Sequence, residues 1–361
     1  MRRQVDSLSA GPKKTPGWIA ATVALLFFVS CSMFQQNESS DKTNSAVAFL
    51  LAGYLLNTQS AVPTVQRNST YNVVKTTHVY AQALSHSNWG STTTSVVDLS
   101  LDLYRPENAP GNRPAMILIH GGGFMTGAKD DANMVDMANY FASRGWVCIS
   151  IDYRLAAARG TLSTAWGNYV LANVVSTERE QSYAMYPAAR DAKAAVRWLY
   201  ANAGTYGINT NYVTALGGSA GSFLANMLGI TNASDFRDES LSIVDTTLST
   251  TNLSSGSTVH TVIDHWGGIH MMTYLQAIDG QSRFDAKDPP ISIVHGTADA
   301  EVPFSQAQAL RDAYISTGAP YEFNALVGAG HGAWSATING RSLSENAFLF
   351  ITQKQNLKVL Q

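Results

Sequence analysis

The segment 211–229 constrains this chain most, because it joins two apolar runs through the turn G-G-S-A-G. The first run, YVTAL, favours a buried strand, and the second, SFLANML, favours a buried helix. A serine that projects from so tight a strand-to-helix turn leaves no room for side chains two residues away, where Gly217 and Gly221 stand. The pattern predicts that Ser219 is a nucleophile. The alternative is a structural turn serine, because G-x-S-x-G also occurs by chance.

Strand-like and helix-like segments alternate on both sides of this turn. Apolar runs with β-favouring residues predict strands at 96–106, 115–120, 146–155, 261–268, 291–296 and 321–328. Helical spacing of apolar residues predicts helices at 131–144, 188–203, 304–317 and 344–355. Such alternation implies the α/β fold class, with a mostly parallel central sheet and helices on both faces. Segments 156–186 and 231–258 are less regular, and the second, which is rich in Ser, Thr, Asn and Asp, fits an inserted surface segment.

A second glycine-rich turn, H-G-G-G-F, follows the predicted strand 115–120. Glycines at the end of a buried strand allow the backbone N–H groups of Gly122 and Gly123 to point into a cavity. Together with the N–H of Ala220, they are suited to hold the negative oxygen of a tetrahedral intermediate. His120 precedes the glycines and is expected to orient them by hydrogen bonding rather than to act as a base. A phosphate-binding turn is the alternative, but it requires G-x-x-x-x-G-K-[ST].

A nucleophilic serine needs a base, and the base needs an acid that orients it. His331 lies in G-A-G-H-G-A-W, a glycine-flanked loop near the C-terminus, and is the predicted base. Asp299 lies in H-G-T-A-D-A-E-V-P, directly after a predicted strand, and is the predicted acid, with Glu301 and Asp288 as its rivals. The chain order Ser219, Asp299, His331 is that of α/β-hydrolases.

The composition gives little support for other kinds of site. His265, His270 and His295 have no metal-ligand spacing such as H-E-x-x-H, so neither a metal nor any other cofactor is expected. The formal net charge is -2 and no basic patch dominates, which argues against a nucleic-acid partner. The sequence does not fix an oligomeric state.

The N-terminus predicts export. Basic residues precede the apolar run WIAATVALLFFV, residues 18–29, which is shorter than the roughly 20 residues that span a bilayer. The letters F-V-S-C that end at Cys31 resemble the lipobox of bacterial lipoproteins, which implies lipidation of Cys31. We therefore expect a signal peptide at 1–30, a lipidated tether and N-terminal segment at 31–70, and a catalytic domain at 71–361. The expected location is a bacterial cell envelope, with the protein anchored to a membrane by lipid. An ordinary secretory signal or an uncleaved anchor is the alternative.

Several segments together resemble α/β-hydrolases of the carboxylesterase/lipase type, close to the hormone-sensitive-lipase-like esterases. They are LDLYRP (101–106), HGGGF (120–124), DYRL (152–155), DAKAAVRWL (191–199), GGSAG (217–221), HGTAD (295–299) and GHG (330–332). The resemblance covers about residues 96–355 and implies a Ser219–His331–Asp299 triad with an oxyanion hole at Gly122, Gly123 and Ala220. It also implies that segments 156–186 and 231–258 are small insertions that cap the pocket. The acid segment is also similar to feruloyl-esterase-like and prolyl-peptidase-like branches.

The expected activity is hydrolysis of small carboxylic esters with short-to-medium acyl chains, by an acyl-enzyme mechanism. Phe124, Trp266 and Trp334 are candidates for an apolar pocket, with ordinary packing as the alternative. Two other functions remain open: a serine peptidase of the same fold, and a non-catalytic adhesion protein built on it.

Overall fold

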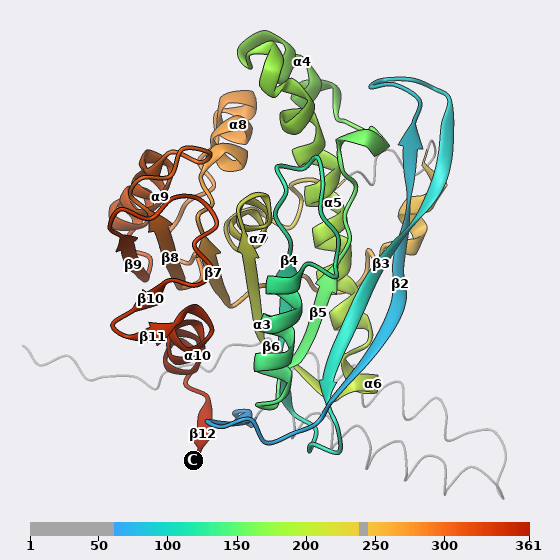
Figure 1. Ribbon diagram of the computed structural model, residues 1–361. Coiled ribbons are helices and arrows are strands. Elements are labelled where there is room, and N and C mark those ends of the chain that lie inside the picture. The colour runs from blue at the N-terminus through green and yellow to red at the C-terminus, as the bar shows by residue number, and fades with distance from the viewer. Residues whose placement is uncertain (1–60, 238–244) are drawn as a thin grey trace, which may run out of the picture. The chain divides into compact units, whose positions relative to one another are not determined.

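The computed structural model describes residues 61–237 and 245–361, and its central feature is an eight-stranded sheet (Figure 1). From edge to edge the strands are β2 (Val73–His86), β3 (Thr94–Pro106), β5 (Val147–Ile151), β4 (Arg113–Ile119), β6 (Ile208–Gly218), β7 (Thr261–His265), β8 (Ile291–Gly296) and β9 (Tyr321–Leu326). β3 is antiparallel to both neighbours, whereas the strands from β5 to β9 are parallel to one another. The predicted mostly parallel sheet is confirmed.

Helices cover both faces of the sheet, as the alternating pattern predicts. α3 (Ala132–Ala142) and α10 (Leu343–Lys354) pack on one face through apolar side chains such as Phe141 and Phe348. α5 (Arg179–Ala201), α7 (Ala220–Ile230) and α9 (Phe304–Thr317) pack on the other face. Every residue of β5 and β8 is buried, which fits strands that are covered on both sides.

α5 begins earlier than the sequence predicts. It starts at Arg179 and carries Pro187 in its interior, whereas the prediction had the helix begin after that proline. A proline lacks the N–H that the helix needs, so a break is the usual outcome. Here the first turns pack against α4 (Thr164–Asn173): the Trp166 indole donates a hydrogen bond of 2.8 Å to the Ser182 carbonyl and contacts the Tyr186 ring. This packing outweighs the local cost of the proline.

Short strands join the two ends of the described chain. β1 (Thr64–Gln66) pairs in parallel with β12 (Lys358–Leu360), and Val65 is fully buried. The remaining elements are η1 (Ala156–Ala158), η2 (Ser176–Glu178), α6 (Ala203–Tyr206), η4 (Thr246–Thr250), α8 (His270–Asp279), β10 (Thr337–Ile338) and β11 (Arg341–Ser342). The predicted signal peptide and Cys31 lie outside the described residues. None of the helices in the described part of the chain is long and apolar enough to cross a membrane.

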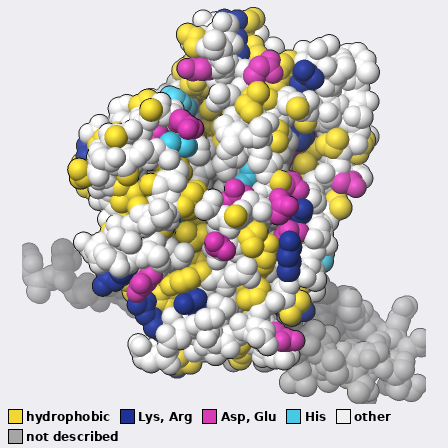
Figure 2. All heavy atoms as spheres, in the orientation of Figure 1, with side chains coloured by type: hydrophobic (Ala, Val, Ile, Leu, Met, Phe, Trp, Pro, Cys, Tyr) yellow, Lys and Arg dark blue, Asp and Glu magenta, His cyan; other side chains and the backbone are white. Residues whose placement is uncertain are grey.

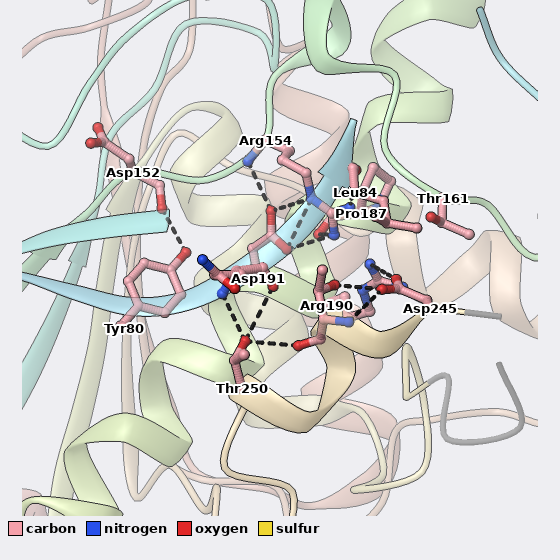
Figure 3. A network of polar contacts seen from close by, with 12 residues as sticks. Tyr80, Leu84, Asp152, Arg154, Thr161, Pro187, Arg190, Asp191, Asp245 and Thr250 are labelled. Atoms are coloured by element: carbon pink, nitrogen blue, oxygen red, sulfur yellow. Dashed lines mark hydrogen bonds and ion pairs between the residues drawn. The ribbon is translucent and has the colours of Figure 1, made fainter. Parts of the chain in front are cut away.

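A buried ion pair joins two of the segments that carry the family resemblance (Figure 3). Arg154 donates to both carboxylate oxygens of Asp191, at 2.6 Å from Nη2 and 2.8 Å from Nε, and both side chains are nearly inaccessible. Arg154 also donates to the Leu84 carbonyl of β2. The pair therefore ties the segment after β5 to α5 and to the edge of the sheet.

The two expected insertions behave differently. Segment 156–186 carries α4 and the first turns of α5. In the second insertion, Asp245 pairs with Arg190 of α5, and the Thr250 hydroxyl accepts a hydrogen bond from the Gln82 N–H of β2 (Figure 3). The described part of that insertion, 231–237 and 245–258, therefore packs along α5 and the sheet edge.

Candidate active site

The turn between β6 and α7 holds Ser219 in a strained conformation. Its φ is 55° and its ψ is −124°, which a residue with a side chain rarely adopts. A Cβ atom on Gly217 would lie 2.2 Å from the Gly221 backbone, and one on Gly221 would lie 2.0 Å from the Ile119 carbonyl oxygen. No side chain fits at those distances. The two glycines of the motif are thus required by the close approach of backbone to backbone.

The structure brings the three predicted catalytic side chains into one hydrogen-bonded chain. Nε2 of His331 lies 2.9 Å from Oγ of Ser219. Nδ1 of the same ring lies 2.8 Å from Oδ2 of Asp299. Ser219 follows β6, Asp299 follows β8 and His331 follows β9, so all three stand at the carboxyl ends of parallel strands. This edge of an open α/β sheet is where ligands bind.

The carboxylate of Asp299 is held by several donors. Oδ1 accepts hydrogen bonds of 2.9 Å from the N–H groups of Glu301 and Val302. Burial alone would raise the pKa of Asp299, but the hydrogen bonds from His331 and from these two N–H groups outweigh it, and the pKa lies below its ordinary value. The group therefore stays an anion that fixes the imidazole.

The two rival acids take other positions. The Glu301 side chain is 74% exposed, and its carboxylate lies 3.7 Å from Nε2 of His331. This is the ring nitrogen that is hydrogen-bonded to Ser219. The Asp288 carboxylate accepts from the Asp285 N–H, and its burial raises its pKa to about 7. Neither rival carboxylate is hydrogen-bonded to the ring nitrogen that Asp299 occupies.

The H-G-G-G-F turn lies directly against Ser219, the predicted nucleophile. A Cβ atom on Gly121 would lie 3.2 Å from the Ser219 Cβ, and Gly122 and Gly123 have φ values of 102° and 61°. The backbone N–H groups of Gly122, Gly123 and Ala220 have no backbone acceptor within residues 61–237 and 245–361. Free N–H groups beside the nucleophile suit an oxyanion hole.

His120 lies beneath this turn. Its ring stacks on Tyr153 at 4.3 Å between centroids, and Nδ1 is 2.7 Å from the Gly121 carbonyl oxygen. Burial lowers the pKa of His120 and favours the neutral ring. The side chain therefore supports the glycine turn from below.

Two cavities flank Ser219. One, of about 680 Å³, lies on the side of His331 and is walled by Met125, Trp266 and Trp334. The other, of about 480 Å³, lies toward α5 and α8, and its lining includes Phe124 and Phe223. All three aromatic residues proposed for a pocket from the sequence therefore line a cavity. Charged side chains are sparse on the molecular face in Figure 2, and neither cavity has a lysine or arginine among its lining residues.

Gln181 and His295 lie at the site, although the sequence predicts a role in catalysis for neither of them. Gln181, in the first turn of α5, lines both cavities, but its segment carries no motif. His295 lies with Nε2 3.3 Å from Oδ2 of Asp299 and 2.8 Å from the Val302 carbonyl oxygen. From the sequence, His295 was considered only as a candidate metal ligand. The described residues contain no group of three or more His, Cys, Asp or Glu side chains that could hold a metal ion.

Comparisons with known proteins give the same picture of the fold. The BD-FAE family model matches residues 101–166 and 163–284, which together make up about half of the chain. A solved thermophilic esterase from Thermogutta terrifontis, bound to butyrate, is 22% identical and superposes with a TM-score of 0.53, covering 78% of this chain and 92% of that one. A truncated carbohydrate esterase from gut microbiota is 21% identical, with a TM-score of 0.51, and covers 81% and 99%. These similarities confirm the α/β-hydrolase fold.

Curated proteins with similar sequences are esterases by name. Isoprenylcysteine alpha-carbonyl methylesterase of Arabidopsis thaliana is 25% identical over 252 residues, which are 64% of this chain and 53% of that protein. Esterase LipQ of Mycobacterium tuberculosis is 23% identical over 265 residues, which are 68% and 57%. The chain thus spans little more than half the length of these relatives.

Proposed function

This chain belongs to the BD-FAE family of hormone-sensitive-lipase-like α/β-hydrolases, and from that premise we propose that it is a serine hydrolase of carboxylic esters. The observation that carries the proposal is the hydrogen-bonded chain from Ser219 through His331 to Asp299, beside two cavities. The esterase names of the curated relatives support the same reaction class.

In the proposed mechanism, Oγ of Ser219 forms a bond to the ester carbonyl carbon and gives its proton to Nε2 of His331. Asp299 holds Nδ1–H and stabilises the imidazolium. The N–H groups of Gly122, Gly123 and Ala220 hold the oxyanion. When the intermediate collapses, the carbon–oxygen bond breaks and the leaving alkoxide takes the proton from His331. Water then attacks the acyl carbon and gives its proton to Nε2 of His331. The bond between the acyl carbon and Oγ of Ser219 breaks, Oγ takes that proton back, and the carboxylic acid leaves, so no cofactor is required.

The same proton transfer assigns the two cavities to the two halves of the ester. The leaving oxygen must reach His331, so the alcohol portion occupies the cavity that His331 lines, beside Trp266 and Trp334. The acyl portion then extends into the other cavity, toward Met185 and Phe223. The preference for short-to-medium acyl chains is the part of the proposal that comes from the sequence, and the cavity of about 480 Å³ is the space in which such chains would lie.

A panel of chromogenic substrates tests the reaction class. We expect the purified full chain to hydrolyse p-nitrophenyl acetate, butyrate and octanoate, and to act much more slowly on the palmitate if the proposed preference for short-to-medium acyl chains is right. Peptide p-nitroanilides should release no measurable dye. Hydrolysis of the anilides at rates similar to the esters would favour the serine peptidase instead. Inactivity on every ester would favour the non-catalytic adhesion protein.

We further propose that Cys31 is lipidated and anchors the protein in a bacterial envelope, on the strength of the basic N-terminus and the F-V-S-C sequence. Mass spectrometry of the protein from bacterial membranes should find a mature N-terminus at Cys31 that carries a lipid. Cys31→Ser should remain unlipidated, whereas the matched variant at the buried free thiol, Cys148→Ser, should be lipidated normally. Cleavage at another residue would refute the lipid anchor and favour an ordinary secretory signal, whereas an unmodified Cys31 in an uncleaved chain would favour an uncleaved anchor.

A further inference from the structure

We propose that Trp334 is a positioning residue for His331, and that its ring does this by filling the space that Gly218 leaves beside the nucleophile. The inference rests on the proposed function, since it concerns the same histidine. It adds roles for Gly218, which directly precedes Ser219 in the sequence, and for Trp334, which follows His331 by three residues.

The first observation is steric. A Cβ atom on Gly218 would lie 2.4 Å from Cζ2 and 2.9 Å from Cη2 of Trp334. Gly218 has no positive φ that would call for glycine, and the two other glycines of the turn are already explained by backbone contacts. The absence of a side chain at 218 is therefore explained by the indole ring that lies against it.

The second observation is that this ring belongs to the loop that carries the base. Trp334 follows His331 by three residues, and its N–H donates 2.7 Å to the Gly332 carbonyl oxygen. His331 itself stands on no helix or strand, so its position depends on what the loop contacts. The Trp334 ring packs against Gly218, and Trp334 lies in the same loop as His331. The packing therefore links the position of His331 to the turn at Ser219.

Neighbouring aromatic rings hold the Trp334 ring in place. The Trp334 ring meets the Trp266 ring edge-on at 4.7 Å and the His265 ring edge-on at 5.2 Å. Trp266 in turn contacts the His331 ring at 6.4 Å. His265 is fully buried and pairs with Gly218 across β6 and β7, and burial lowers its pKa to about 3, so the ring is neutral at ordinary pH. The cluster joins the ends of β6 and β7 to the loop after β9.

A double-mutant cycle tests the inference. Gly218→Ala should push the indole aside and lower kcat by roughly 10²-fold, because a displacement of the base by about 1 Å costs that much, with little change in KM. Trp334→Leu should lower kcat similarly, and Trp334→Phe should retain most of it. In the Trp334→Leu background, Gly218→Ala should have almost no further effect, because the ring it collides with is gone. Gly204→Ala is the control, because a Cβ atom added at Gly204 would meet no heavy atom within 4 Å. This variant should match the wild type.

Multiplying effects in the double variant would overturn the inference, because the two residues would then act independently. A readout without turnover separates this outcome from a failure of the proposed function. The downfield proton resonance of Nδ1–H of His331, hydrogen-bonded to Asp299, should appear in the wild type and in Trp334→Phe and should be lost in Gly218→Ala. If no ester is hydrolysed, the proposed function fails, and this resonance still decides the role of Trp334: its persistence in Gly218→Ala would refute that role.

Discussion

Ser219→Ala should lower kcat for p-nitrophenyl butyrate by about 10⁶-fold, the loss typical of a serine that acts in a triad. The substitution removes one oxygen atom from a turn whose geometry is set by other atoms. The Ser219 N–H donates 2.9 Å to the His265 carbonyl oxygen, and the flanking glycines remain in place. The variant should therefore fold and bind substrate, and it should retain a small rate above that of water from the N–H groups of the oxyanion hole.

The matched control is a second serine three residues later, in the first turn of α7. Ser222 is fully buried and donates 2.6 Å to the Gly217 carbonyl oxygen, so Ser222→Ala removes a structural hydroxyl. This variant should lose stability, measured by denaturant unfolding, and retain turnover in the folded fraction. A Ser219→Ala enzyme that keeps more than about a hundredth of the wild-type kcat would contradict the assignment of the nucleophile.

The elements that the sequence predicts well are those whose signal is local. The turn at Ser219 is one of these, because glycine spacing and the flanking apolar runs reflect contacts within a few residues. Strand 291–296 and helix 304–317 have the predicted bounds for the same reason. The order of nucleophile, acid and base in this fold class, together with the loop positions after predicted strands, pointed to Asp299 and His331, but it left Glu301 and Asp288 open as rival acids.

What the sequence could not supply depends on contacts between distant segments. α5 continues through Pro187 because α4 packs on its first turns, and no local pattern encodes that packing. Gln181 lines the same cavities as Ser219, although it lies in a segment without a motif. From the sequence, Gly218 cannot be told from an ordinary turn glycine, because the ring that packs against it belongs to Trp334, more than a hundred residues later. The same limit applies to the second insertion, of which the described part packs along α5 instead of lining the cavities.

Asp299→Asn should lower kcat by about 10⁴-fold while leaving KM nearly unchanged. The amide keeps the shape of the side chain, but it offers no negative charge to the imidazolium, and its NH₂ group can hold His331 in the wrong tautomer. Because Oδ1 accepts from two backbone N–H groups, the loop after β8 should keep its form in the variant. Steady-state kinetics on p-nitrophenyl butyrate measure the effect.

The same experiment on the two rivals decides which carboxylate orients the base. Glu301→Gln and Asp288→Asn should each keep kcat within a few-fold, since neither side chain is hydrogen-bonded to Nδ1 of His331. A larger loss in Glu301→Gln than in Asp299→Asn would transfer the role to Glu301.

The pH dependence of unfolding gives an independent check on Asp299. The pKa of Asp299 is lowered in the folded chain, so its charge stabilises the fold above the unfolded pKa, and this contribution is lost as the pH falls through the lower folded value. Asp299→Asn should therefore weaken the acid sensitivity of unfolding below the ordinary carboxylate range, because the amide does not titrate there.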